Sequence, residues 1–378
     1  MVTRPYQICE RCVMDTSDPL IEFSAEGQCN LCTDFLQNRV GLLQRTSDDG
    51  DTIEGVMNAV KARGRGRRYD CIIGVSGGVD SSYLCALAVE HDLRVLAVHL
   101  DNGWDSLISV ENIRNLLSSL HLDYESYVLP WKQFREVQVA FLKGSVPEAE
   151  TPTDIAITRA THHFALKHRV PAILSGGNIA GEGILPVSWH YNARDTGYTY
   201  AILDAAGCPR RYFRSQRFSA RDEIYCKFIR GIRTFYPLNH VRYDREVARN
   251  MLVQEHGWQY YGSKHGESSY TKFIQSYYLY AKHGIDYRRA TLSSEILIGA
   301  QTRSEALNLL ETKPYEPAEV EEAKEYISKK LRLAHAEMEA IMAAPPKFFF
   351  DYPNSARALG LLYDGYRTLT GKRKTSNF

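Results

Sequence analysis

The sequence predicts an α/β fold with a doubly wound, mostly parallel sheet, an N-terminal zinc ribbon and a mainly helical C-terminal region. From residue 69 onward, short apolar runs alternate with segments of helical spacing, a rhythm typical of βαβ units. Two closely spaced pairs of cysteines occupy the first 32 residues. Helical periodicity dominates beyond residue 244. A chain of 378 residues is long enough for two or three such structural units.

The composition is that of a globular protein with balanced charge. Hydrophobic residues make up 44% and charged residues 24% of the chain, and the formal net charge is +1. This balance gives no global attraction for nucleic acid or an anionic membrane, so neither partner is expected. The N-terminus lacks the apolar segment of a signal peptide, and no apolar run approaches the roughly 18 residues of a membrane helix. We therefore expect a soluble cytoplasmic protein with reduced thiols.

The four N-terminal cysteines follow the pattern C-x2-C-x16-C-x2-C, and they are Cys9, Cys12, Cys29 and Cys32. Two knuckles with this spacing bring four thiolates to one tetrahedral Zn²⁺ ion, so we predict a zinc ribbon over residues 1–45. Because no ligand position is left for water, the ion is expected to be structural. Two disulfides are the alternative, although they suit a secreted protein.

A linker is predicted between the ribbon and the first strand, over residues 46–68. Its second half carries the basic, glycine-containing run VMNAVKARGRGRR. Such a run is most often a solvated linker, and the alternative is an arm that contacts phosphate.

Four apolar runs form the predicted sheet in a domain assigned to residues 69–243. They read YDCIIGV, RVLAVHL, YESYVL and VPAILSGG. Parallel sheets bind ligands at the carboxyl ends of their strands, where polar and glycine residues gather in this chain. Residues 186–243 break the rhythm and are predicted to be an insert. Residues 244–378 are assigned to the helical C-terminal region.

The segment IIGVSGGVDSSYL places two glycines between a strand and a helix. Glycines allow a ligand to approach the backbone closely, and the N–H groups of a helix N-terminus attract an anion. The motif lacks the lysine of a Walker A loop. Asp80 would repel phosphate unless it binds a metal ion that also binds phosphate, so pyrophosphate with Mg²⁺ accounts for the whole combination. The alternative is a tight turn in which Ser81 or Asp80 caps the helix.

The heptapeptide SGGVDSS resembles the PP-loop of the N-type ATP pyrophosphatases, which implies an adenine nucleotide α-hydrolase-like fold. That superfamily includes NAD, GMP, asparagine and argininosuccinate synthetases and tRNA-thiolating enzymes. Three further segments make the chain similar to one branch, the N-acetyl sugar amidotransferases of surface-polysaccharide biosynthesis. They read CERCVMDTSDPLIEFSAEGQCNLC, AVHLDNGWDS and GSKHGESSYTKFIQSYYL, and the resemblance runs from about residue 6 to about residue 310.

The resemblance implies an ATP-dependent ligase that forms an amidine. ATP would adenylate the acetamido oxygen of a nucleotide-activated N-acetyl sugar, with UDP as the expected carrier, and release pyrophosphate. Ammonia-derived nitrogen would then expel AMP and give an acetamidino sugar for lipopolysaccharide O-antigen. The sequence shows no glutaminase signature, so a separate glutaminase subunit and a cyclase-like subunit are the expected partners that supply ammonia.

The PP-loop likeness assigns five residues to the pyrophosphate of ATP, and Gly177 at the end of the fourth strand joins the same nucleotide site. Asp80 is the predicted Mg²⁺ ligand and acts in catalysis through that ion. Glu182 follows the fourth strand at a place similar to that of a second metal-binding acid in NAD synthetases; a solvated loop acid is the alternative. Asp101 would bind ribose or form an Asx turn with the two residues after it. The five pyrophosphate residues are Ser76, Gly77, Gly78, Ser81 and Ser82.

A second charged segment, SKHGESSYTKF, supplies candidate catalytic groups. Lys264 and Lys272 would neutralise the α-phosphate during adenylation. Either His265 or Glu267 would take a proton from attacking ammonium. A place on the solvated surface is the alternative for each of these charges.

The segment CPRRYFRSQRFSARDE interleaves arginines with aromatic residues, which suits the diphosphate and uracil of a UDP-sugar or, alternatively, RNA. A second hypothesis is therefore a tRNA-thiolating PP-loop enzyme with an N-terminal zinc ribbon. Such enzymes usually need catalytic cysteines, and only Cys208 and Cys226 are candidates here. A third hypothesis is a zinc-ribbon interaction protein with an inactive nucleotide domain, and the intact loop motif argues against it.

Overall fold

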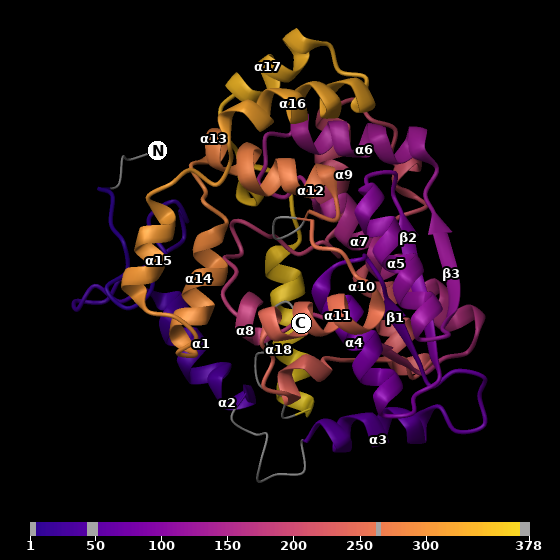
Figure 1. Ribbon diagram of the computed structural model, residues 1–378. Helices are drawn as coiled ribbons and strands as arrows, with labels where there is room; N and C mark the ends of the chain where they lie inside the picture. The colour runs from indigo at the N-terminus through magenta and orange to yellow at the C-terminus, as the bar shows by residue number, and fades with distance from the viewer. Residues whose placement is uncertain (1–4, 44–51, 262–265, 371–378) are drawn as a thin grey trace.

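A parallel sheet of five strands lies at the centre of the chain, in the order β3-β2-β1-β4-β5 (Figure 1). The computed structural model describes residues 5–43, 52–261 and 266–370. All neighbouring strands in the sheet run parallel, which confirms the predicted α/β class. The strand order reverses between β1 and β4, and the carboxyl ends of two such strands form the usual ligand crevice. The strands are β1 Cys71–Gly74, β2 Val95–Asp101, β3 Asp123–Val128, β4 Ala172–Leu174 and β5 Arg233–Phe235.

Helices cover both faces of the sheet: α3 (Ile53–Arg63), α4 (Val79–Glu90), α5 (Leu107–Ser119) and α11 (Arg245–His256) on one, and α6 (Trp131–Lys143) and α7 (Thr151–Lys167) on the other. Alternate strand residues point to opposite faces. Ile73 and Ala97 join the core under α3, α4, α5 and α11. Ile72 and Val98 join the core under α6 and α7. Because both faces of β1, β2 and β4 are buried, these three strands read as apolar runs, whereas the edge strand β3 is largely exposed.

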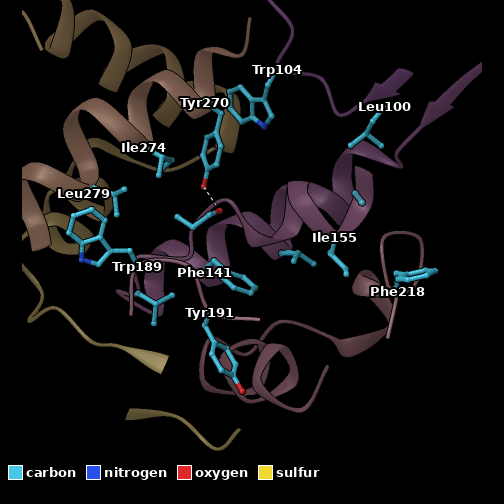
Figure 2. Packing of buried hydrophobic residues seen from close by; sticks show 14 of the residues in the cluster. Leu100, Trp104, Phe141, Ile155, Trp189, Tyr191, Phe218, Tyr270, Ile274 and Leu279 are labelled. Atoms are coloured by element: carbon cyan, nitrogen blue, oxygen red, sulfur yellow. Dashed lines mark hydrogen bonds between the residues drawn. The ribbon is translucent and has the colours of Figure 1, made fainter. Parts of the chain in front are cut away.

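Beyond α11 the chain is helical, as predicted, and its helices share the core under α6 and α7. Figure 2 shows Tyr270, Ile274 and Leu279 together with Trp104 and Phe141 in this core. The helices of the second half are α8 (Ile179–Glu182), α9 (Thr196–Ala205), α10 (Ala220–Ile224), α12 (Ser269–Phe273), α13 (Leu279–His283), α14 (Arg288–Leu297), α15 (Arg303–Leu310), α16 (Pro317–Leu331), α17 (His335–Ala343) and α18 (Ala356–Thr370). A π-helical turn at Ile274–Tyr278 joins α12 to α13.

The N-terminal segment packs on the C-terminal region. It contains α1 (Asn30–Asn38) and α2 (Val40–Leu43), and it lies beside α14 and α15 (Figure 1). Val13 forms a small core with Leu292 and Ala306, and its N–H donates to Ser293 Oγ at 3.2 Å. The N-terminal segment and the region of α14 and α15 therefore share one interface.

The sequence did not indicate β5, which pairs with β4. This strand lies inside the expected insert, at residues 186–243. It has only three residues, and two of them are exposed, so it lacks the apolar pattern by which the other strands were found. None of the described helices combines the length and apolar character needed to cross a membrane.

Candidate functional site

The glycine loop connects β1 to α4 at the point where the strand order reverses. Gly77 has a positive φ of 77°, and a Cβ atom placed on it would lie 2.5 Å from the carbonyl oxygen of Ser109. A side chain is therefore excluded by both the backbone conformation and the space. The N-cap of α4 is Gly78, which provides no side-chain cap. The N–H groups of the first helical turn remain available to an anion.

Three serines surround this helix N-terminus. The hydroxyl oxygens of Ser76 and Ser81 lie 3.3 Å apart, and the N–H of Gly78 donates to Ser76 Oγ at 3.3 Å. Ser82 is buried, and its Oγ has no hydrogen-bond partner among the described residues. The combination of backbone donors, hydroxyls and glycines fits a bound polyphosphate. The alternative, a helix capped by Ser81 or Asp80, is not found: the N-cap residue is Gly78, no side chain caps it, and Ser81 Oγ donates to the Gly78 carbonyl at 3.2 Å.

Asp80 is in the first turn of α4, where its carboxylate accepts a hydrogen bond from the Tyr243 hydroxyl. Burial and the charge of Asp80 raise the pKa of Tyr243, and Arg245 opposes this shift. Burial and Glu267 likewise raise the pKa of Tyr261, again against Arg245. A carboxylate fixed beside an anion-binding loop suits a Mg²⁺ ion that also binds phosphate, so the residues present fit the predicted group.

The loop after β4 reaches the same place. A Cβ atom on Gly176 would lie 3.2 Å from the backbone carbon of Asp80, so the two loops are in close contact. The N–H of the adjoining Gly177 donates to Ser175 Oγ at 3.2 Å. Glu182 is at the end of α8, where it interacts electrostatically with Tyr287, the residue before the neighbouring α14.

Asp101 forms the Asx turn that was one of its two expected roles, since its Oδ1 accepts the N–H of Gly103 at 3.0 Å. It also lines a cavity of about 480 Å³ between β2, β3 and α5. His99 lies between this cavity and the glycine loop. Its Nδ1 is 2.8 Å from the Val75 carbonyl oxygen and its Nε2 is 3.2 Å from Asp105 Oδ2. The cavity lining comprises His99, Asp101, Gly103, Asp105, Val110, Ile113, Arg114, Leu117, Tyr124 and Ser126.

Glu267 is brought to the glycine loop from far along the chain. Its backbone carbonyl accepts the N–H of Ser106 at 2.9 Å, and the N–H of Ser269 donates to the Trp104 carbonyl at 3.1 Å. These bonds hold the segment antiparallel to the residues that follow β2. As a result, Glu267 Oε1 lies 3.6 Å from the position of a Cβ atom on Gly78. Lys264 and His265 lie outside the described residues.

Lys272 forms an ion pair with Glu319 of α16 at 2.9 Å, and both side chains are about half exposed. The structure thus gives it a partner away from the glycine loop, and its catalytic role stays a prediction. In the arginine-rich segment, Arg210 pairs with Asp204 and lies 4.9 Å from the ring centroid of Tyr200. That arginine is already neutralised within the chain.

The four N-terminal cysteines converge, with all four Sγ atoms within 4.8 Å of one another and all four residues buried. The Sγ atoms of Cys9 and Cys32 are 3.7 Å apart, and those of Cys12 and Cys29 are 3.8 Å apart. Sulfurs at about 2.3 Å from one tetrahedral Zn²⁺ ion are separated by about 3.8 Å (2.3 Å × 1.63). The cluster therefore fits a single tetrahedral metal ion.

Backbone donors surround these sulfurs. The N–H groups of Arg11, Cys12 and Cys29 donate to Cys9 Sγ at 3.2–3.5 Å. Arg303 of α15 donates to the carbonyl oxygens of Cys9 and Cys12, at 2.8 Å and 3.0 Å for its closest bonds. This arginine ties the first knuckle to the C-terminal region.

The other cysteine candidates differ from this cluster. Cys208 and Cys226 are buried, and burial raises the pKa of both thiols, to about 11 for Cys208. A protonated thiol is a weak nucleophile and a poor metal ligand. In the described part of the chain, the N-terminal four are the only group of three or more metal-binding side chains that converge.

Sequence reasoning missed Tyr243, Arg245 and Tyr261. Arg245 begins α11, and Tyr243 and Tyr261 lie before and after this helix. All three lie near the glycine loop, although Tyr243 is 163 positions from Asp80. No spacing rule connects residues so far apart. The only indication was that helical packing near the carboxyl edge of a parallel sheet tends to enclose a ligand.

Residues 267–366 match the family model described as "LPS biosynthesis protein WbpG-like, C-terminal domain". The match begins at the residue whose carboxylate lies against the glycine loop. Over this part of the chain, the match agrees with the resemblance recognised from the sequence. A search of curated protein sequences found no match to the chain.

Three solved structures share part of the architecture at low similarity. An NH3-dependent NAD synthetase from Campylobacter jejuni is 14% identical, with a TM-score of 0.30 over 48% of this chain and 84% of that chain. The U34-tRNA thiolase NcsA from Methanococcus maripaludis, with its [4Fe-4S] cluster, is 14% identical, with a TM-score of 0.34 over 82% and 89%. An NMN synthetase from Francisella tularensis is 13% identical, with a TM-score of 0.27 over 65% and 100%. At this level they say nothing about the activity of the chain.

Proposed function

Because the chain carries the C-terminal domain of the WbpG-like lipopolysaccharide biosynthesis proteins, we propose that it is an ATP-dependent N-acetyl sugar amidotransferase. It adenylates the acetamido oxygen of a nucleotide-activated sugar and replaces that oxygen with nitrogen. The products are an acetamidino sugar, AMP and pyrophosphate, and the UDP-linked sugar is the substrate that we favour. A reaction that consumes ATP and a nucleotide sugar belongs in the cytoplasm.

One observation carries this proposal: Glu267, the first residue of the WbpG-like domain, lies against Gly78 of the glycine loop. The part of the chain that identifies the family thus contributes directly to the site where the loop would hold ATP. A sugar bound by the C-terminal domain would meet the α-phosphate at this contact. Proximity of two bound reactants is a major source of rate enhancement.

The chemistry explains why such a site needs ATP. An amide carbonyl is a poor electrophile, since its oxygen would have to leave as hydroxide. When the amide oxygen attacks the α-phosphorus, pyrophosphate leaves and the oxygen becomes part of AMP, which departs as a stable anion. The backbone N–H groups at the start of α4 and the hydroxyls of Ser76 and Ser81 would hold the departing pyrophosphate. Arg245 would offset negative charge nearby.

Two metal ions are part of the proposal. Asp80 would hold Mg²⁺, which supplies charge neutralisation at the phosphates, and Glu182 would be the second acidic ligand. Cys9, Cys12, Cys29 and Cys32 would hold Zn²⁺. The separations of 3.7 Å and 3.8 Å between their sulfurs support one ion rather than a larger cluster, in which each cysteine binds a different iron.

Nitrogen would come from a separate glutaminase subunit together with a cyclase-like subunit. An activated imidate hydrolyses if it meets water first, and free ammonia is scarce at neutral pH, so delivery from a docked partner solves both problems. The isolated chain should use ammonium only at high concentration and elevated pH. Amide-¹⁵N glutamine should give labelled amidine only when the glutaminase is present.

The direct test incubates the purified chain with ATP, Mg²⁺, ammonium and a panel of UDP-linked acetamido sugars. We expect amidine and AMP in equal amounts by mass spectrometry. With ¹⁸O in the acetamido group, the label should appear in AMP, because the amide oxygen leaves with the phosphate. Pyrophosphate release without sugar dependence, or a mobility shift of bulk tRNA by the chain, would count against this function and favour the thiolating alternative.

A further inference from the structure

Two buried carboxyl groups lie immediately before α7, at Glu148 and Glu150. They flank Ala149, whose carbonyl oxygen accepts the Tyr270 hydroxyl at 3.4 Å, the dashed line in Figure 2. Glu148 faces α9, since its Oε2 accepts the hydroxyl of Tyr198 at 3.0 Å. Glu150 faces α12, since its Oε2 accepts the hydroxyl of Thr271 at 2.6 Å. The two acids are thus directed to different surroundings.

Glu150 lies near Glu267, the residue of the WbpG-like match that lies against the glycine loop. Thr271, its hydrogen-bond donor, follows Glu267 by four positions, and the carboxylates of Asp154 and Glu267 both interact with Glu150 electrostatically. Tyr270 and Tyr287 are the other titratable groups that face it. The charges around Glu150 are therefore negative, which favours a bound proton or a cation.

One oxygen of Glu150 has no assigned partner. Its Oε1 is buried without a hydrogen-bond partner among the residues that the structure describes, and the same holds for Oγ1 of the adjoining Thr151. Thr151 is only 2% exposed. Buried polar atoms are usually satisfied in native proteins, so these two adjacent atoms are open to a hydrogen bond from a bound polar group. Oε1 of Glu148 likewise has no partner among the described residues, so the two acids differ in their surroundings rather than in this respect.

The surroundings of Glu150 also raise the pKa of its carboxyl group. Burial and the nearby Asp154 and Glu267 raise the pKa of Glu150 to about 8, although the hydrogen bond from Thr271 opposes the shift. A carboxyl group with a pKa near the working pH can both take up and release a proton efficiently. An ordinary exposed glutamate holds a proton too weakly for this.

We propose that Glu150 binds the incoming ammonium and accepts the proton that it must lose to attack the activated amide. This role rests on the proposed function. When ammonium reacts with the neutral imidate, two of its hydrogens stay on the new nitrogen and one moves to the sugar nitrogen. The fourth leaves through the Glu150 carboxylate to solvent. The nitrogen lone pair forms the C–N bond, and the C–O bond breaks with its electron pair leaving on AMP.

The test compares Glu150→Gln with Glu148→Gln, a matched variant that places the same amide two positions away, facing Tyr198. Sugar-dependent pyrophosphate release measures adenylation, and amidine formation measures the second step. In Glu150→Gln we expect pyrophosphate release within about threefold of wild type but amidine formation from ammonium about 100-fold slower. Hydroxylamine is neutral at pH 7 and needs no base before attack, so it should restore most of the rate. Glu148→Gln should stay within a few-fold in all assays.

Three results would overturn this role for Glu150: an equal loss with ammonium and hydroxylamine, an equal loss in the two variants, or no loss in Glu150→Gln. Each leaves the proposed function standing if the wild-type chain makes amidine. A wild-type chain that releases no pyrophosphate with any acetamido sugar would overturn both the function and this role.

Discussion

The cysteine cluster and the glycine loop are both built from short turns, but they differ in whether their polar atoms have hydrogen-bond partners within the chain. In the cluster, backbone N–H groups point at the sulfurs and all four cysteines are buried. In the loop, a glycine N-cap leaves the helix N-terminus uncapped, and Ser82 Oγ has no partner among the described residues. A site that is satisfied within the chain holds structure, whereas a site with unsatisfied donors awaits a ligand. The two sites should therefore respond differently to mutation.

The largest effect is expected at the cluster. Cys29→Ser should release the metal and unfold the N-terminal ribbon, because structural zinc contributes on the order of 10 kcal/mol in small modules. Metal analysis should find about one zinc per wild-type chain and none in the variant, which should also lose solubility and thermal stability. Cys226→Ser, at a buried cysteine outside the cluster, is the control and should keep its zinc. A zinc-free wild type with full stability would contradict the prediction.

Asp80→Ala should have the reverse profile, with the fold kept and activity lost. Removing the Mg²⁺ ligand is expected to slow AMP formation by about a thousandfold, which corresponds to about 4 kcal/mol of transition-state stabilisation. Circular dichroism and thermal unfolding should stay close to wild type. Tyr243→Phe, which removes only the hydrogen bond to Asp80, should cost about tenfold or less. Near-normal turnover of Asp80→Ala in saturating Mg²⁺ would mean that the loop acts without this carboxylate.

A third effect depends on pH and concerns the two acids that precede α7, Glu148 and Glu150. The pKa values of Glu148 and Glu150 are raised by burial, to about 7 and about 8. Between about pH 4.5 and pH 8 the folded chain therefore holds protons that the unfolded chain has released, so stability falls as pH rises through this window. Urea unfolding of Glu150→Gln should show a flatter profile above pH 7, and an unchanged slope would contradict the raised pKa.

The smallest effect is expected where the cluster meets the C-terminal region. Arg303→Ala removes the donors to the Cys9 and Cys12 carbonyls and should lower the free energy of unfolding by about 1–3 kcal/mol, with zinc still bound. Denaturant unfolding measures this change. Arg221→Ala, at an exposed arginine, should change stability by less than about 0.5 kcal/mol. Loss of zinc from Arg303→Ala would show that the interface helps to form the metal site.

Local patterns were sufficient for the sheet and for the two turn-built sites. Strands β1, β2 and β4 have apolar runs, the cysteine spacing is short, and the glycine loop is contiguous. The longest of these signals, the cysteine pattern from Cys9 to Cys32, spans 24 residues of sequence. Predictions of this kind depend on the chain's own short-range geometry.

The rest depended on long-range packing. Strand β5 has three residues and forms only because β4 offers an unpaired edge. The partners of Glu150 come from α12, 121 positions away, and composition around PEAE gives no sign of a buried acid. The ion pair of Lys272 with Glu319 likewise joins distant parts of the chain and could not be read from the sequence. Tertiary contacts decide such cases, and no local pattern encodes them.

The hydrogen bonds from Arg303 to the first cysteine knuckle have a consequence for synthesis on the ribosome. The knuckle is among the first segments to leave the exit tunnel, yet its partner lies 291 positions later in the chain. At about 5–20 residues per second, the gap amounts to roughly 15–60 s. During that interval α15 does not exist, so a bound metal ion would be what holds the nascent knuckle in shape. Metal supply during translation would then govern the yield of folded protein.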